Sequence, residues 1–181
     1  AGRIGMRTYL MALAASLMLV AGMAEAHGPS RQKTTQSVTL DATPEEVWAA
    51  VGNFADMSWF PGVASVDAPE GNTKDGSRTV VLEDGTALTQ ELTKYDEAKR
   101  LISWRWTADN IEVLPVTNFS TALAVKDEGG KALVELRGAY YRGFPNNDPP
   151  PELNDEAATA AVDAYYQTGI AALVERFGAA E

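Results

Sequence analysis

The C-terminal segment, residues 154–178, constrains the fold most, because it predicts one long amphipathic helix. Asn154 can cap its first turn, and Gly178 follows its last turn. Asp155 and Glu156 suit the positive end of the helix dipole. At about 100° per residue, the apolar side chains fall on one contiguous face. These are Ala158, Val162, Tyr165, Tyr166, Gly169, Ile170, Leu173 and Phe177. A helix of this kind has to lie against an apolar surface.

A series of strand signals supplies that surface. Residues 35–42 alternate, with Gln36, Val38 and Leu40 on one side, which is typical of a half-buried strand. Six further segments separated by turns complete an antiparallel meander of about seven strands. They are residues 63–68, 77–82, 87–95, 101–107, 118–125 and 132–141.

Two short helices are expected between the first two strands. Thr43, Pro44 and Glu46 form a capping box with proline at the first helical position, which predicts a helix over residues 44–52. Residues 53–59 predict a second short helix, which ends before Pro61 because the residue preceding a proline avoids helical angles.

This order of elements predicts an α+β fold, in which a curved antiparallel sheet wraps around the long C-terminal helix. It is the helix-grip arrangement, with the two short helices closing one end. A helix of about 22 residues spans about 33 Å at 1.5 Å per residue, and it cannot fill the whole concave face of a large sheet. We therefore expect a cavity between sheet and helix, where a small ligand could bind.

Aromatic side chains are the candidates for lining that cavity. Trp104 and Trp106 lie two apart on a strand, so both face one side, and Gly138 on a facing strand leaves room beside them. Plain burial in the core is the alternative for each candidate, and it is favoured for the tryptophans. The ten candidates are Trp59, Phe60, Trp104, Trp106, Phe119, Leu136, Tyr140, Tyr165, Tyr166 and Gly169. Phe54 and Trp59 are expected in the core. For Phe60, a position nearer the surface, at the cavity mouth or a contact patch, is the alternative to the core position, which is favoured.

The N-terminal segment predicts export. Residues 6–7 give a basic start, residues 9–23 are apolar, and residues 24–26 fit an A-x-A cleavage pattern, so residues 1–26 predict a cleavable signal peptide. Residues 1–5 are interpreted as upstream read-through. Cleavage would leave a flexible polar start at residues 27–33 and one domain at residues 34–178. We therefore expect a periplasmic bacterial protein with no stable membrane insertion after cleavage.

Composition excludes several functions. Without Arg3, Arg7 and Glu25, the chain after residue 26 holds 13 basic and 24 acidic residues, a net charge of −11, so nucleic acid is not expected as a partner. There is no cysteine and one histidine, His27, which is insufficient for a His-rich metal site or a Ser-His-Asp triad. The sequence predicts no cofactor, no metal and no catalytic residue. Glu91, Asp96, Asp109 and Glu112 are interpreted as solvated carboxylates; the alternative is that a buried one serves as an acid or base.

Several stretches resemble a known superfamily. Residues 38–63, with their strand, Pro-Glu-Glu-Val-Trp helix and following Phe, Trp and Pro, are similar to the opening of the SRPBCC superfamily, the START-like and polyketide-cyclase-like helix-grip proteins. Residues 88–106 resemble the mid-sheet hairpin of that superfamily. The resemblance extends over nearly all of the chain after residue 26.

A narrower resemblance concerns function. Five features are together similar to MxaD-type proteins. They are the signal peptide, the start at residues 27–30, residues 114–125, residues 140–143 and the segment from Pro149 onward. The resemblance implies a periplasmic accessory protein of methanol oxidation, which assists a quinoprotein methanol dehydrogenase and its c-type cytochrome. It carries over no catalytic residue.

Three functions therefore compete. The first is the non-catalytic accessory role, with the dehydrogenase and the cytochrome as partners. The second is binding of a small apolar ligand, such as a lipid or a quinone, in the cavity. The third is a cyclase- or dehydratase-like enzyme, which requires a polar group facing into the cavity.

Overall fold

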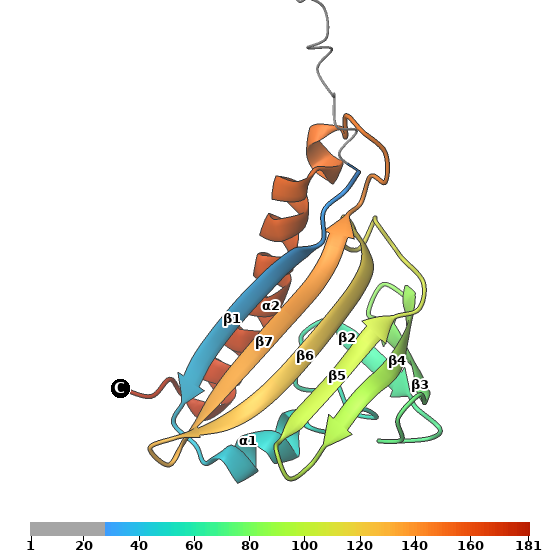
Figure 1. Cartoon of the computed structure of the whole chain (residues 1–181). Coiled ribbons are helices and arrows are strands. Elements are labelled where there is room, and N and C mark those ends of the chain that lie inside the picture. The colour runs from blue at the N-terminus through green and yellow to red at the C-terminus, as the bar shows by residue number, and fades with distance from the viewer. Residues whose placement is uncertain (1–27) are drawn as a thin grey trace, which may run out of the picture.

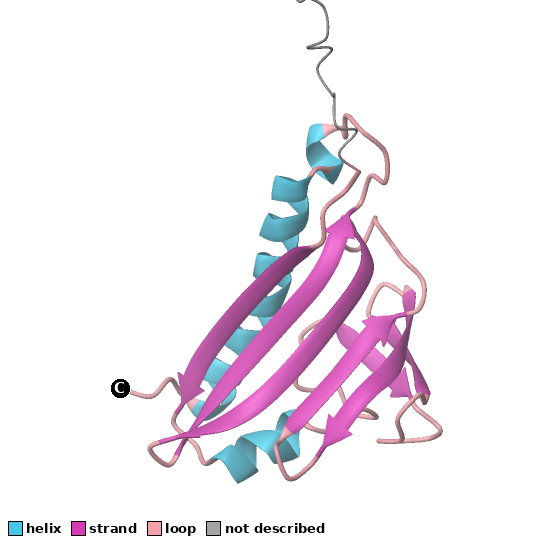
Figure 2. Ribbon diagram, viewed as in Figure 1, coloured by secondary structure: helices cyan, strands magenta, loops and turns pink. Residues whose placement is uncertain are grey.

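A computed structural model describes residues 28–181, so the predicted signal peptide and His27 lie outside the described residues. Seven strands form one antiparallel sheet, and a long helix, α2 (Asp155–Phe177), lies along one face of it (Figures 1 and 2). The strands are β1 (Gln32–Leu40), β2 (Val63–Asp67), β3 (Ser77–Leu82), β4 (Ala87–Asp96), β5 (Leu101–Trp106), β6 (Val116–Glu128) and β7 (Lys131–Arg142). The helix-grip architecture predicted from the sequence is confirmed.

The strand order is β1-β7-β6-β5-β4-β3-β2, so the first strand pairs with the last. The register shifts between Leu92 and Lys94 on β4, and between Thr117 and Ser120 on β6. Such bulges bend a strand and increase its twist, which lets the sheet curve. The β6 bulge contains Asn118 at φ 50°, and Asp109 accepts a hydrogen bond from its backbone N–H.

The first helix, α1 (Pro44–Val51), begins as the sequence predicts. Thr43 Oγ1 accepts from the Glu46 N–H at 3.2 Å, and Glu46 Oε2 accepts from the Thr43 N–H at 3.0 Å, which completes the capping box. Val47, Ala50 and Val51 are buried.

The second predicted short helix, over residues 53–59, is not formed; this segment is a series of turns. Asn53 Oδ1 accepts from the Ala55 N–H, and Asp56 Oδ1 accepts from the Ser58 N–H. These local bonds give the backbone an alternative to helical hydrogen bonds. Asn72 then fixes the segment to the β2–β3 loop by accepting from the Phe54 N–H at 2.8 Å.

The long helix has the caps and the buried face that the sequence predicts. Asn154 Oδ1 accepts from the Ala157 N–H, and Gly178 caps the other end. Ala158, Val162, Tyr166, Gly169, Ile170 and Leu173 are buried. The chain then turns back to β1, where the Asp41 N–H donates to Gly178 and the Ala180 N–H donates to Thr39.

The other departures concern boundaries. Strand β1 begins at Gln32, so the end of the predicted flexible start is part of the sheet. The proline-rich connector before α2 contains one turn of 3-10 helix, η1 (Pro151–Leu153). Within residues 28–181, no helix is both long enough and apolar enough to cross a membrane.

Candidate functional site: a buried arginine among aromatic side chains

The candidate site is a row of polar side chains on the buried face of β3, β4 and β5. The sheet register places Arg78 opposite Gln90, and Gln90 opposite Trp106. Strand alternation turns all three toward the core, because their neighbours two positions away are also buried. Arg78 is 3% exposed, and Gln90 is 1% exposed. A cation therefore lies inside the molecule.

Neutral groups surround the Arg78 guanidinium. Its Nε donates to Gln90 Oε1 at 2.8 Å, and its Nη1 donates to the Phe54 carbonyl at 2.9 Å. The Phe54 and Trp104 rings lie 4.3 and 4.8 Å from Arg78 Cζ, within the range of cation–π attraction. Arg78 has no ion pair with any Asp or Glu of residues 28–181. A buried charge is usually paired, so this arrangement is unusual.

Two donors of the row remain unused. Arg78 Nη2 and Trp106 Nε1 are buried and make no hydrogen bond within the described part of the chain. Buried donors are nearly always paired, because leaving one unpaired costs about 1–3 kcal/mol. Both atoms belong to side chains in the same register row. The row can therefore donate to oxygen atoms of a bound molecule.

Tyr165 adds a further donor near the row. Burial raises the pKa of Tyr165 to about 12, although the charge of Arg78 lowers it in part. Burial lowers the pKa of Arg78 to about 9, and Tyr165 opposes that shift. At neutral pH, Arg78 is a cation and Tyr165 carries its proton. Tyr165 Oη has no hydrogen bond to another residue of 28–181, so it is also available as a donor.

The hydroxyl groups of the other two interior tyrosines already form hydrogen bonds within the protein. The Tyr140 and Thr34 hydroxyls are 2.6 Å apart, and the Tyr166 and Thr121 hydroxyls are 2.8 Å apart. Burial raises the pKa of Tyr166 far above its usual value, so its hydroxyl stays neutral. The Tyr166–Thr121 pair joins α2 to β6, and the Tyr140–Thr34 pair joins the neighbouring strands β7 and β1.

The structure gathers the ten predicted cavity residues in one interior region. All are buried except Tyr165, which is half-buried. Phe119 lies at their centre, with ring centroids 5.4 Å from Trp106, 6.1 Å from Tyr140 and 6.2 Å from Tyr166. Phe60 packs on Tyr165 at 4.8 Å. Leu136 is 2% exposed on β7.

Phe60 takes the core position that was favoured for it, since it is only 8% exposed. A glycine on α2 explains this position. A Cβ atom at Gly169 would lie 2.8 Å from Phe60 Cε2 and 3.1 Å from Trp59 Cζ3. The missing side chain therefore lets both rings pack directly on the helix.

Gly138 has a different role from the one expected. The space above it is filled by Tyr166, because a Cβ atom there would lie 2.7 Å from Tyr166 Oη. The room at this position holds a side chain of α2 and does not lie open beside the tryptophans.

Sequence reasoning missed Arg78 and Gln90. The signal was present in the alternation of residues 77–82 and 87–92, which places Arg78 with Val80, and Gln90 with Leu88 and Leu92. A charged or amide side chain in phase with buried apolar residues points into the core.

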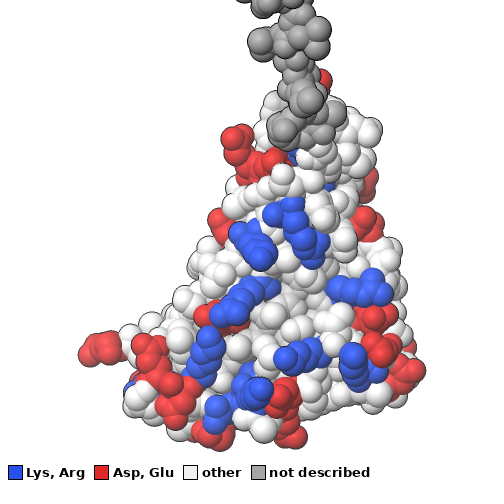
Figure 3. All heavy atoms as spheres, viewed as in Figure 1, with Lys and Arg blue, Asp and Glu red and all other residues white. Residues whose placement is uncertain are grey.

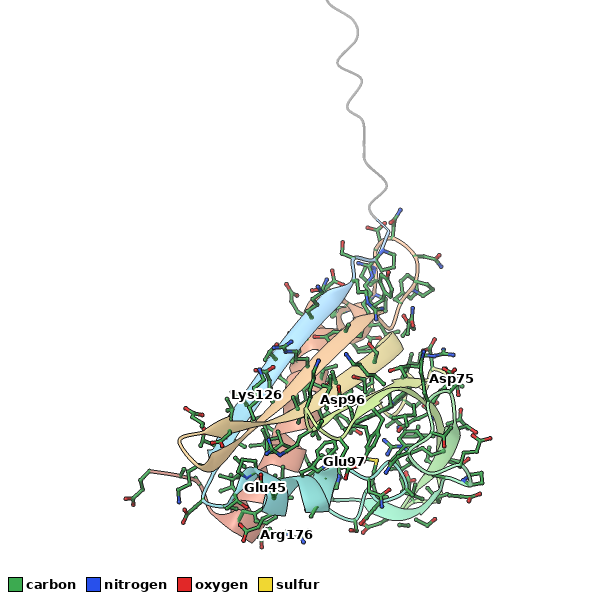
Figure 4. All side chains as sticks on the ribbon, turned by 60° about the horizontal axis from the view of Figure 1, so that its bottom comes forward. Glu45, Asp75, Asp96, Glu97, Lys126 and Arg176 are labelled. Atoms are coloured by element: carbon green, nitrogen blue, oxygen red, sulfur yellow. The ribbon has the colours of Figure 1, made fainter. Side chains whose placement is uncertain are left out.

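The predicted surface carboxylates do lie at the surface. Glu91 pairs with Arg105, and Asp96 accepts from the Lys99 N–H in the β4–β5 turn. Figure 4 shows Asp96 and Glu97 in this region. Glu45 of α1 and Glu97 line one external hollow of about 470 Å³, beside the stacked rings of Trp48 and Tyr95. Residues 28–181 hold no group of three His, Cys, Asp or Glu side chains placed to bind a metal.

A family model described as "Polyketide cyclase / dehydrase and lipid transport" matches residues 31–178. The chain belongs to this family. A search of curated proteins finds no match. The broad resemblance to the SRPBCC superfamily is confirmed, whereas the narrower closeness to MxaD-type proteins stays a prediction.

Solved structures similar to this chain agree with the fold. An uncharacterized protein from Bacillus thuringiensis has 26% identity and a TM-score of 0.67, with 81% of this chain and 98% of that chain covered. The protein XoxI from Bacillus cereus has 27% identity and a TM-score of 0.66, with 80% and 94% covered. The Zhui aromatase/cyclase from a Streptomyces species, at 16% identity, a TM-score of 0.61 and coverage of 81% and 93%, shares the fold.

Proposed function

We propose that this polyketide cyclase-like protein binds a small, mostly apolar molecule that carries a carboxylate or carbonyl oxygen, and that Arg78 anchors that oxygen. The observation that carries the proposal is the unpaired Nη2 of a buried arginine that has no carboxylate partner. An oxygen at this position would accept a charge-assisted hydrogen bond, which is about twice as strong as a neutral one.

The surroundings of Arg78 suit the rest of such a molecule. Aromatic rings on β5, β6 and α2 offer flat apolar contact, while Trp106 Nε1 and Tyr165 Oη offer further donors. Ligand sites are commonly apolar surfaces with a few placed polar groups. A flat ring system with an oxygen at one edge matches this combination.

Protonation favours binding over proton abstraction. The buried polar side chains of residues 28–181 are Thr34, Arg78, Gln90, Thr121 and Arg142. With pKa values of about 9 and about 12, Arg78 and Tyr165 hold their protons at neutral pH and act as donors. They can stabilise a negative oxygen, whereas a cyclase also needs a group that accepts a proton.

A cyclase- or dehydratase-like activity is the related alternative, since aromatase/cyclases share the fold. The same donors would then stabilise an enolate oxygen during the reaction. Turnover of a bound aromatic ketone would distinguish this activity from simple binding.

The test compares two fluorescent probes. 8-Anilinonaphthalene-1-sulfonate is an aromatic anion, and N-phenyl-1-naphthylamine has a similar body without the charge. We expect Arg78→Met to weaken binding of the sulfonate about tenfold, since a hydrogen bond to a charged group contributes about 1.5–3 kcal/mol. Binding of the neutral amine should change less than twofold.

Arg105→Met is the matched control, because Arg105 lies on the next strand but one and points to the outer face. It should leave both affinities unchanged. If Arg78→Met folds normally and binds the sulfonate as tightly as the wild type, Arg78 has only a structural role. Arg78→Lys provides a second test that keeps the charge.

The accessory role in methanol oxidation is a second proposal, and one observation favours it. Parts of the stretches that carry the narrower resemblance meet at one end of the molecule. Val116 of β6 pairs with Arg142 of β7, and Arg142 donates to the carbonyls of Phe144 and Asn146 in the connector. The Phe144 N–H donates to Leu153 just before α2. Parts of these stretches therefore lie side by side at this end of the molecule.

This second proposal has two tests. Micromolar protein should raise the rate of electron transfer from a methanol dehydrogenase to its c-type cytochrome, and no rate effect would contradict the role. Export is tested separately: mass spectrometry of a periplasmic fraction should find a mature chain that begins at His27.

A further inference from the structure

The outer face of the sheet concentrates positive charge on a chain that is acidic as a whole. Figure 3 shows Lys and Arg side chains spread over this face, with Asp and Glu mainly at its margins. We call it the basic face and define it by Lys33, Lys94, Lys99, Arg105, Lys126 and Arg137. Within residues 28–181, α2 covers the opposite face, and no helix covers this one (Figure 1).

The sheet register aligns these cations across neighbouring strands. One row runs from Lys94 through Ser103 and Ala122 to Arg137. The next runs from Arg105 through Ser120 and Ala139 to Lys33. Cations thus flank a strip of small side chains in the middle of the face.

The strip forms two adjoining hollows. One, of about 330 Å³, is bordered by Lys33, Arg137, Ser103 and Ser120. The other, of about 240 Å³, is bordered by Lys99, Lys126 and Arg137. Arg137 and Ala122 line both hollows, so together they make a groove with cations on its rim.

Neighbouring carboxylates neutralise only part of this charge. Glu135 accepts salt bridges from both Lys126 and Arg137, and Glu91 accepts one from Arg105. Lys33, Lys94 and Lys99 make no ion pair with any residue between 28 and 181. The face therefore keeps positive charge that these carboxylates do not neutralise.

We infer that the basic face docks an acidic segment of a partner protein, laid along the groove. Four strand spacings of about 4.8 Å give about 19 Å, which an extended segment of about six residues spans. Complementary charge of this kind mainly raises the association rate and selects the partner.

An anionic membrane fits the face less well than a protein. The only exposed large hydrophobic side chain of residues 28–181 is Ile111, in the β5–β6 loop, so the face offers no large exposed apolar side chain for insertion. A planar lipid surface would also meet Glu91, Glu135 and the acidic margins. A protein segment can place its carboxylates opposite the cations alone.

The test uses a fluorescent hexaglutamate peptide. At about 20 mM salt we expect saturable 1:1 binding, which falls at least tenfold at about 150 mM because screening weakens exposed charge pairs. The double substitution Lys33→Gln and Arg137→Gln should reduce affinity at least tenfold at low salt. Lys74→Gln, on an exposed loop away from the face, is the matched control.

Three outcomes would overturn the inference. One is equal peptide binding by the double variant and the wild type. Another is tighter binding to phosphatidylglycerol vesicles than to the peptide, lost in the same variant, which would assign the face to membranes. The third is a wild-type dimer in sedimentation equilibrium that the variant loses, which would assign it to a second copy of this chain. The double variant should bind the aromatic sulfonate normally, so this test is independent of the interior site.

Discussion

Gly138 and Tyr166 determine how closely α2 approaches the sheet. The Tyr166 hydroxyl lies over Gly138 and pairs with Thr121 on the neighbouring strand at 2.8 Å. A side chain at position 138 would occupy the place of that hydroxyl. The glycine is therefore required by space on its inner side, and its φ angle is not positive.

We expect Gly138→Ala to destabilise the protein by about 1–3 kcal/mol, the usual effect of overpacking a core. Urea unfolding would measure it. Ala139→Ser, at the next position on the outer face, should change stability by less than about 0.5 kcal/mol.

Tyr166→Phe supplies the decisive comparison. It removes the hydroxyl oxygen, which is the atom nearest the methyl group that Gly138→Ala introduces. The double variant should therefore lose less free energy of unfolding than the two single variants lose in sum. Simple additivity would show that the two positions do not interact.

The candidate site was only partly predictable at the level of residues. Trp104, Trp106 and Tyr165 could be assigned inward positions, because alternation in strands and helical spacing fix direction. The hydrogen bonds and pKa shifts around Arg78 could not be predicted. They depend on Phe54, Gln90 and Tyr165, which come from separate parts of the chain.

At the level of elements, Gly169 allows α2 to pack closely against Phe60 and Trp59. Glycine in a helix interior costs about 1 kcal/mol relative to alanine, so the helix is less stable in isolation than it could be. The contact with Phe60 and Trp59 offsets this, because a methyl group at position 169 would lie 2.8 Å from Phe60. Overpacking of about 1–3 kcal/mol exceeds the gain in helix propensity.

We therefore expect Gly169→Ala to destabilise the protein, by up to about 2 kcal/mol. Ala171→Gly, at an exposed position of the same helix, calibrates the propensity and should cost about 1 kcal/mol. Combined with Phe60→Leu, Gly169→Ala should become neutral or stabilising. Thermal unfolding measures the stability of all four variants: Gly169→Ala, Ala171→Gly, Phe60→Leu and the double variant. If Gly169→Ala alone stabilised the protein, the packing argument would be contradicted.

Most elements were predictable because their signals are local. Alternation of apolar and polar residues predicted the strands, and capping residues predicted the two α-helices. The predicted ends lie within a few residues of those observed. Residues 53–59 failed because Asn53 and Asp56 bond their own backbone, which a pattern of apolar residues does not show. The β1–β7 pairing and the positions of the bulges depend on long-range contacts, which the sequence does not display.

At the scale of the whole molecule, charge is segregated. Cations gather on the basic face, while the chain after residue 26 carries a net charge of −11. Net repulsion of this size favours expanded states, and dissolved salt screens it.

We expect the free energy of unfolding at pH 7 to rise by about 1 kcal/mol when salt increases from about 10 to about 200 mM. Near pH 4.5, where Asp and Glu are partly protonated, the same increase in salt should change the free energy of unfolding little. Urea titrations at both pH values measure the difference. Destabilisation by salt at pH 7 would mean that ion pairs outweigh net repulsion.

The pairing of β1 with β7 has a consequence for how the chain folds. The Thr34 and Tyr140 hydroxyls touch although the two residues are 106 positions apart in the sequence. Strand β1 therefore pairs only after β7, the last strand, is available. Closing so large a loop is entropically slow, and proteins dominated by such distant pairings fold in milliseconds to seconds. A nascent chain that stops before Lys131 would leave β1 with an open hydrogen-bonding edge, exposed to wrong neighbours until synthesis is complete.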